Sequence, residues 1–279
     1  MKANWDVLKG RLGINNADKP EKWFSLRYEN FRVAPGAQGD GSWSNMLANC
    51  CVPDIRRNAA YRRYCQPMSS VNGASTNNVP GFVITFRTQI SEGENFFGKP
   101  LMVGDSQFSP ADYATKIESV GVYFEGYDRA TDRTKAGCYL AAEPNIYLVP
   151  VGRDVMYSPI GTDDRQALAW NVVDQVMPLP YTIGTSELDS STWVSTFSSL
   201  AGPGSAATIR RHSTMRMGYD FTSTRLVGRS AWNTEWMLVI PLSSLNGDLN
   251  TPRATVRDAF ASAVKDIKLG VRAYSRQGN

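Results

Sequence analysis

The chain contains 279 residues, of which 42% are hydrophobic, 20% are charged and 11% are aromatic, and its formal net charge is +4 at pH 7. This length can bury a self-sufficient core, and the aromatic content together with 23 Gly and 15 Pro favours a turn-rich all-β protein. The small net charge argues against nucleic acid as a partner, and no apolar run reaches the roughly 18 residues of a membrane span.

The first part of the chain, residues 1–79, predicts an N-terminal arm. Residues 5–12 carry apolar side chains at near-helical spacing, and an apolar and basic run follows at 23–31. Residues 34–42 predict a glycine-rich loop, which with 43–45 offers oxygen ligands at alternate positions but lacks the downstream Glu of a calcium loop. Residues 69–80 are rich in Ser, Asn and Gly, and we expect them to link the arm to a β domain.

A helix is predicted over residues 53–65, with Pro53 in its first turn and Pro67 after its end. Basic and aromatic side chains are interleaved along it, and they are Arg56, Arg57, Tyr61, Arg62, Arg63 and Tyr64. Such a surface can bind phosphate or carboxylate groups or stack on aromatic rings. The alternative is an exposed helix whose arginines cover the β domain and pair with acids such as Asp54.

Short strands separated by turn signals recur from residue 81 onward. The predicted strands are 82–87, 119–124, 146–149, 170–176, 208–217, 225–230, 236–240 and 266–279. One amphipathic helix begins at Thr251 and Pro252, with Val256, Phe260 and Val264 on one face. Many strands and few helices predict an antiparallel β-sandwich, of jelly-roll type, over residues 80–279.

The final strand has the clearest pattern, because Ile267, Leu269, Val271 and Ala273 alternate with polar residues. Residues of this strand and of segment 108–124 form a motif, namely Pro110, Tyr113, Lys116, Ile117, Ser119, Val120, Asp266, Ile267, Leu269, Arg272 and Tyr274. Because of this motif, the segment 80–279 resembles the C-terminal β-domain of the A subunits of insecticidal ABC (Tc) toxin complexes. The resemblance implies a β-sandwich that docks onto a partner subunit, and the outward strand face offers Arg272 and Tyr274 as candidate contacts.

Residue types that support catalysis are scarce in this sequence. The only histidine, His212, lies in a predicted strand, and the sequence contains no nucleophile elbow and no phosphate-binding loop. The acidic pairs Asp128/Asp132 and Asp163/Asp164 lie beside arginines, which is typical of solvated turns. We therefore predict no catalytic residue, no metal site and no cofactor.

The cysteines and the N-terminal residues bear on the cellular compartment. Cys50, Cys51, Cys65 and Cys138 are irregularly spaced, which favours buried thiols over a disulfide framework, with a bridge from Cys50 or Cys51 to Cys65 as the alternative. Residues 1–9 have no apolar stretch or cleavage site, so we expect no Sec signal and a cytoplasmic protein before any non-classical release.

The tryptophans supply a second candidate binding surface. Of seven, Trp232 and Trp236 lie four residues apart, and exposed Trp side chains provide affinity in sugar-binding modules and protein interfaces, although core packing is their usual role. We predict a non-enzymatic binding or assembly module that contacts a protein partner or a second copy. A carbohydrate-binding module and a glycoside hydrolase with dispersed carboxylates are the alternatives.

Overall fold

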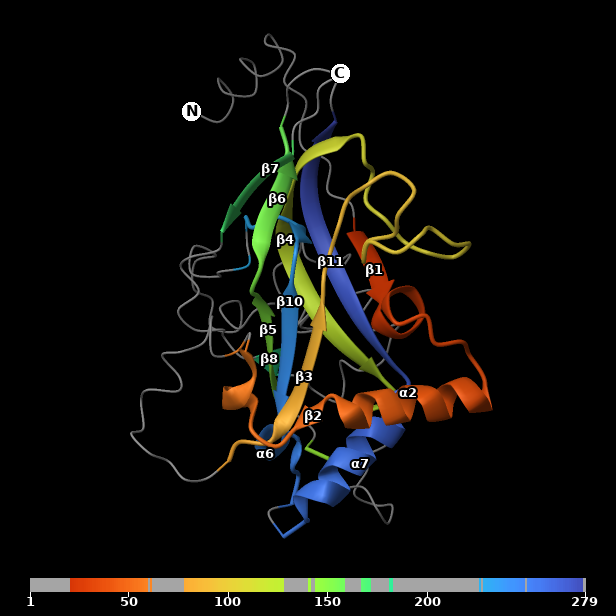
Figure 1. Cartoon of the computed structure of the whole chain (residues 1–279), viewed down its shortest axis with the longest axis vertical. Helices are drawn as coiled ribbons and strands as arrows, with labels where there is room; N and C mark the ends of the chain where they lie inside the picture. Colours follow the sequence, from red (N-terminus) through yellow and green to blue (C-terminus); the bar gives the residue numbers. More distant parts are fainter. Residues whose placement is uncertain are drawn as a thin grey trace, which may run out of the picture.

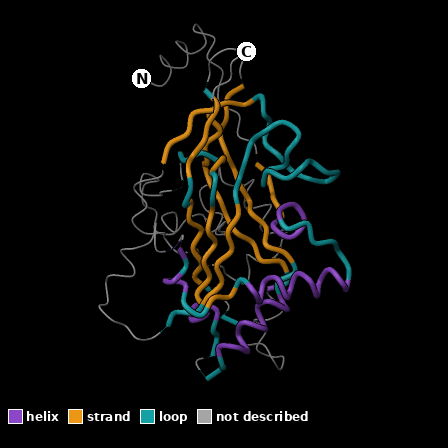
Figure 2. The backbone as a smooth tube through the Cα atoms, viewed as in Figure 1, coloured by secondary structure: helices purple, strands orange, loops and turns teal. Residues whose placement is uncertain are grey.

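The computed structural model describes residues 21–59, 61, 78–127, 140–141, 144–158, 167–171, 181–182, 226, 228–248 and 250–277. Its strands pair antiparallel in three sheets, with a few short helices, and this confirms the predicted all-β, sandwich-like class. None of the helices in these ranges is both long enough and apolar enough to cross a bilayer. Helices α2 (Ala37–Asn49), α6 (Leu242–Leu245) and α7 (Arg253–Ala263) lie at one end of the sheets (Figures 1 and 2).

Within each sheet, consecutive strands in the following order are hydrogen-bonded neighbours. The first sheet contains β1 (Glu21–Ser25), β11 (Asp266–Gln277) and β4 (Asp112–Glu125). The second sheet contains β2 (Cys51–Val52), β3 (Gly81–Phe86), β10 (Trp236–Pro241), β5 (Asn145–Pro150) and β8 (Tyr181–Thr182). The third sheet contains β7 (Ala167–Asn171), β6 (Arg153–Tyr157) and β9 (Trp232–Asn233).

Strand β11 lies in the middle of the first sheet and has the predicted two faces. Leu269 is paired with Phe24 of β1 and with Val122 of β4. All three side chains are buried, whereas Lys268 points the other way and forms an ion pair of 2.7 Å with Glu125. The period-two alternation of the sequence therefore identified the core face correctly.

The main core includes side chains of the first two sheets, and helix α7 (Arg253–Ala263) contributes to it. Phe260 of α7 contacts Phe82 of β3 at 4.7 Å and Phe124 of β4 at 5.3 Å between ring centroids. Val256, Phe260 and Val264 are all buried, as their spacing predicted. One amphipathic helix thus closes an end of the core that both sheets share.

The second sheet is largely buried on both faces over β5, β10 and β3, with Thr85 of β3 as an exposed position. A second apolar cluster contains Val83, Val149, Val239 and Met237 on the outer face, where Ile55 and Tyr61 cover them. A strand buried on both faces reads as a continuous apolar run and not as an alternation. This explains the runs at 146–149 and 236–240.

The glycine-rich stretch at 34–42 is not a loop throughout, and that prediction was wrong. Helix α2 (Ala37–Asn49) begins within it, after Gly36, whose φ is 104°. Trp43 and Leu47, four residues apart, are buried, and Trp43 donates a hydrogen bond of 2.9 Å to the carbonyl of Val264. Tertiary packing of these side chains outweighs the low helix propensity of glycine. The oxygen-bearing side chains of 39–45 therefore lie on a helix and not in a calcium loop.

Residues 21–59 contribute strands to two of the sheets and side chains to the core. Phe24, Leu26, Trp43 and Leu47 belong to the main core cluster, and β1 is hydrogen-bonded to β11. The predicted N-terminal arm, over its described part, therefore does not stand apart from the β domain. The predicted linker lies mostly outside the described residues.

Two further predicted elements differ from the structure. Residues 53–65 do not form one helix, because the 3₁₀ turn η2 (Ile55–Arg57) ends at Asn58, whose backbone is extended. Residues 228–230 form a turn and a single bridge from Ser230 to Lys116 where a strand was predicted. The predicted strand 208–217 lies outside the described residues, as does the end of 170–176.

Replacing Leu269 by Ala should lower the free energy of unfolding by about 2–5 kcal/mol, because the change leaves a cavity in the main core. Its neighbour Lys268 is the matched control, since the partly exposed ion pair with Glu125 contributes about 1 kcal/mol or less. Urea unfolding followed by tryptophan fluorescence measures both variants. Equal losses in Leu269→Ala and Lys268→Ala would contradict the assignment of the two strand faces.

Candidate functional site

A long loop, residues 87–111, connects β3 to β4 and extends from the side of the sheets, drawn in orange to yellow in Figure 1. Its tip is apolar and exposed, with relative exposures of 43% for Leu101, 60% for Met102 and 108% for Val103. Consecutive apolar side chains in water carry an unfavourable hydration free energy that binding can relieve. This tip is the candidate functional site.

Hydrogen bonds within the loop hold the tip in one conformation. Asp105 N–H donates to the carbonyl of Met102 at 3.1 Å, and Met102 N–H donates to the Asp105 carboxylate at 2.8 Å. Leu101 N–H donates to the carbonyl of Gly93 at 3.0 Å, and Gly104 adopts a φ of 92° that favours glycine. The apolar side chains are therefore presented on a tight, internally bonded turn.

Asp105 also attaches the tip to the rest of the protein. Arg32 binds its carboxylate through two hydrogen bonds, of 2.7 and 2.8 Å, which is the bidentate geometry of a strong ion pair. Asn95 donates to the same carboxylate at 3.3 Å. Burial opposes ionisation of Asp105, but Arg32 and the Met102 N–H outweigh it and hold the pKa of this carboxyl below its ordinary value.

Glu29 forms a second attachment from the π-helix η1 (Leu26–Asn30). Its two carboxylate oxygens each accept a backbone N–H at 2.5 Å, one from Ser106 in the loop and one from Ser25 in β1. Burial raises the pKa of Glu29 to about 7, although both N–H groups act in the opposite direction. The backbone carbonyl of Glu29 accepts a further bond from Asn95 at 3.0 Å.

Aromatic packing fixes the loop on both sides of the tip. Phe96 stacks on Phe24 of β1 at 3.9 Å between centroids, and Phe108 packs on Phe24 at 5.5 Å. Phe97 packs edge-on against Phe86 of β3 at 5.9 Å. All three loop rings are buried, so residues 98–107 are the part of the loop that lies outside the aromatic core.

The π-helix is itself held by a buried ion network. Arg27 is buried, and its guanidinium donates to the carbonyls of Lys265 at 2.9 Å and Ala34 at 3.0 Å and pairs with Asp40 at 2.7 Å. Its backbone N–H donates to Asp266 at 3.1 Å, and burial raises the pKa of Asp266 to about 6. The first residue of β11 thus positions the element that anchors the loop.

The predicted basic and aromatic helix is not assembled as one surface in the described residues. Arg56 forms two hydrogen bonds to Asp54, of 2.9 and 3.0 Å, as the alternative interpretation expected. Tyr61 is buried in the second apolar cluster, while Arg57 has an exposed side chain at 79%. Arg62, Arg63 and Tyr64 lie outside the described residues.

The two predicted tryptophans do not form an exposed platform. Trp236 is only 4% exposed, and its indole N–H donates to the Thr88 hydroxyl at 2.9 Å. Trp232 is half-buried and packs edge-on against Tyr157 at 5.2 Å. The expectation of a surface role for Trp236 was therefore wrong, because β10 is buried on both faces.

Arg272 and Tyr274 lie on the face of β11 opposite to its buried apolar residues, as predicted. Both are half-buried, and Arg272 pairs with Glu118 of β4 at 3.3 Å. They give a mainly polar strand surface. A contact role for either residue stays a prediction.

Several other residues singled out in the sequence lie outside the described residues, namely His212, Asp128, Asp132, Asp163, Asp164, Cys65 and Cys138. Cys50 and Cys51 are half-buried free thiols, and burial raises the pKa of each. Within the described ranges, no group of three or more His, Cys, Asp or Glu side chains could hold a metal ion.

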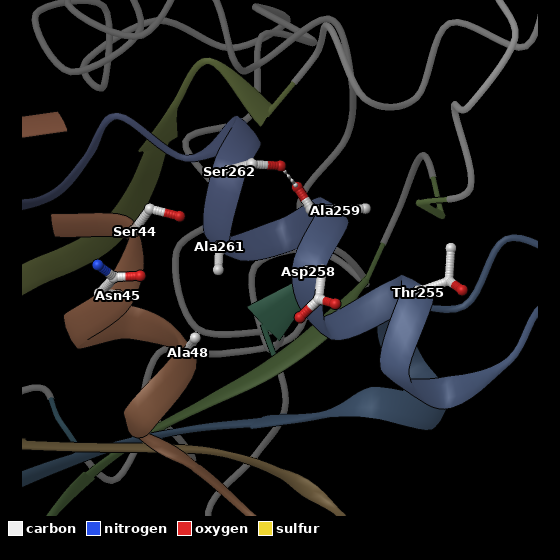
Figure 3. Close-up of a pocket in the computed structure, with 8 residues that line it drawn as sticks. All are labelled: Ser44, Asn45, Ala48, Thr255, Asp258, Ala259, Ala261 and Ser262. Atoms are coloured by element: carbon white, nitrogen blue, oxygen red, sulfur yellow. Dashed lines mark hydrogen bonds between the residues drawn. The ribbon is translucent and has the colours of Figure 1, made fainter. Parts of the chain in front are cut away.

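A shallow groove of about 600 Å³ lies between α2 and α7 (Figure 3). Small and polar side chains line it, namely Ser44, Asn45, Ala48, Thr255, Asp258, Ala259, Ala261 and Ser262. Asp258 is paired with Arg257 at 2.7 Å, and Ser262 donates to the carbonyl of its own helix at Ala259. The groove therefore offers little apolar contact, unlike the loop tip.

Reasoning from the sequence did not identify the loop tip. A signal was present, because Leu101, Met102 and Val103 form an apolar run between Pro100 and Gly104 in a stretch with no strand pattern. Nothing local shows that the run is exposed. Compared with known proteins, the sequence matches no family model and no curated protein.

Replacing Asp105 by Asn should loosen the tip, because the neutral amide loses the charge-assisted bonds from Arg32. We expect a local loss of about 1–2 kcal/mol, which makes chymotryptic cleavage after Leu101 or Met102 about 5- to 30-fold faster. Glu92→Gln is the matched control, since Glu92 is an exposed acid of the same loop. Equal cleavage rates in the two variants would show that Asp105 does not hold the tip.

Proposed function

We propose that this chain is a non-enzymatic binding and assembly protein whose loop tip inserts into an apolar pocket of a partner protein. The observation that carries the proposal is the exposure of Leu101, Met102 and Val103 on a turn that is anchored on several sides. Protein interfaces are centred on a few side chains that fill pockets of the partner, and an anchored apolar turn can present such side chains.

The energetics of such an insertion are favourable. Burying a fully exposed Leu, Met or Val side chain provides about 1.5–3 kcal/mol before the costs of association. Val103 can gain all of this, whereas Leu101 and Met102 gain less because they are only 43% and 60% exposed. Those costs are reduced here, because the Asp105 hydrogen bonds order the turn before binding. A partner pocket that receives all three side chains would therefore gain most of their burial energy.

The charges beside the tip favour a protein pocket over an anionic bilayer. Leu101 is hydrogen-bonded to Gly93, and Pro100 is bridged to Glu94, so the turn at 92–94 lies next to the tip. This turn contains two acids, Glu92 and Glu94. Acidic side chains beside the contact are repelled by anionic lipids and are complementary to a basic rim.

The resemblance of residues 80–279 to the C-terminal β-domain of toxin A subunits supports a docking role as well. The apolar motif residues Ile117, Val120, Ile267 and Leu269 are all buried in the main core. Buried residues of this kind indicate a shared fold and do not form a contact surface. The docking role proposed here therefore rests on the loop and takes the resemblance only as additional support.

A photo-crosslinking residue at Met102, in the full chain in its native cells, tests the proposal. We expect crosslinks to one defined protein at Met102 and none at the control position Thr85, which is exposed on β3. Binding of that purified protein should weaken about 100-fold or more in a Met102→Asp, Val103→Asp variant, because the two side chains lose their burial energy and the pocket would have to receive two carboxylates.

Two outcomes would contradict this proposal. One is crosslinking that is equal at Met102 and Thr85. The other is binding to vesicles of phosphatidylcholine and phosphatidylserine that is lost in the Asp variant, which would assign the tip to a bilayer. Thermal unfolding at an unchanged temperature would show that the variant is folded.

A further inference from the structure

We propose that Glu29 is a proton-sensitive lock that holds the tip segment, residues 98–107, more firmly in mildly acidic than in alkaline solution. The lock acts by joining two distant parts of the chain through one buried side chain. Ser25 ends β1, and Ser106 lies 77 residues from Glu29 along the sequence. Releasing the segment breaks the bond to Ser106 and exposes Glu29 to water.

The aromatic packing confines this release to the tip segment. Phe96, Phe97 and Phe108 remain attached to Phe24 and Phe86 in the main core. Opening of residues 98–107 therefore need not unfold the sheets. Local opening of this kind costs less free energy than global unfolding.

The charged groups around Glu29 come from η1, the segment after it, the loop and β11. Asp105 in the loop and Asp266 in β11 both repel its carboxylate. Two cations lie nearby, but the Arg32 guanidinium is bonded to Asp105 and the Arg27 guanidinium is paired with Asp40. Neither cation has Glu29 as its ion-pair partner, so burial dominates the protonation of this carboxyl.

The direction of the pH dependence follows from linkage between protonation and opening. With the loop anchored, the pKa of Glu29 is about 7, and once released Glu29 takes its ordinary value of 4.5. A proton therefore binds more tightly to the anchored form, and the anchored form is favoured at low pH. The advantage is complete below about pH 4.5 and is lost as the pH rises through 7.

The size of the effect is measurable. The pKa difference corresponds to a change of about 300-fold in the opening equilibrium, of which about 70-fold falls between pH 5 and pH 8. If the tip binds a partner as proposed above, binding should also tighten on acidification, because the ordered turn is more populated. That consequence rests on the proposed function, whereas the lock itself does not.

Hydrogen exchange followed by mass spectrometry tests the lock on the full chain without any partner. The quantity to compare is the protection factor of a peptide covering residues 98–107, which removes the intrinsic pH dependence of exchange. We expect it to fall more than tenfold from pH 5 to pH 8 in the wild-type protein. In Glu29→Gln the fall should be less than threefold, because the amide does not titrate.

Asp54→Asn is the matched control, since Asp54 is also a buried acid but bonds to Arg56 and lies outside the network around Glu29. The fall should persist in that variant. A flat profile in the wild-type protein, or an undiminished fall in Glu29→Gln, would overturn the lock. If Glu29→Gln does not fold, the wild-type series still decides, and no outcome depends on partner binding.

Discussion

A single buried guanidinium holds together the elements on which the candidate site depends. Arg27 bonds to the start of α2 through Asp40, to the preceding segment through Ala34, and to the junction of α7 and β11 through Lys265. A buried charge is costly unless such partners compensate for lost hydration. These partners bind both terminal nitrogens of Arg27 and hold η1 against β11, so the loop has a fixed surface to attach to.

Two carboxylates attach the loop to that surface, and their environments differ. Asp105 has a bidentate arginine partner, which keeps its pKa low and its charge constant near neutrality. Glu29 has only backbone N–H donors, so burial leaves its pKa at about 7. Asp105 therefore stays ionised near neutrality, whereas the protonation of Glu29 changes there, although the two carboxyl groups are neighbours in space.

The motif at the end of the chain and the loop tip have different roles. The apolar motif residues of β4 and β11 form the core, and Asp266 positions η1. The exposed apolar residues lie between β3 and β4, outside any strand. Folds recur with many functions, and a binding role has to be argued from the exposed site and not from the core pattern.

The sequence by itself determined the strands β3, β4 and β11 and the helix α7, because their apolar periodicity is local and reports the buried face directly. It also determined β10, because a continuous apolar run is an equally local signal. It did not determine α2, where burial of Trp43 and Leu47 outweighs two glycines, and it did not reveal the loop tip. Both depend on contacts between distant residues. Arg27 and Asp266 are 239 positions apart, and Glu29 and Ser106 are 77 apart, so no local window contains either bond. Only the tertiary structure brings these partners together, because burial and loop anchoring are properties of the assembled core.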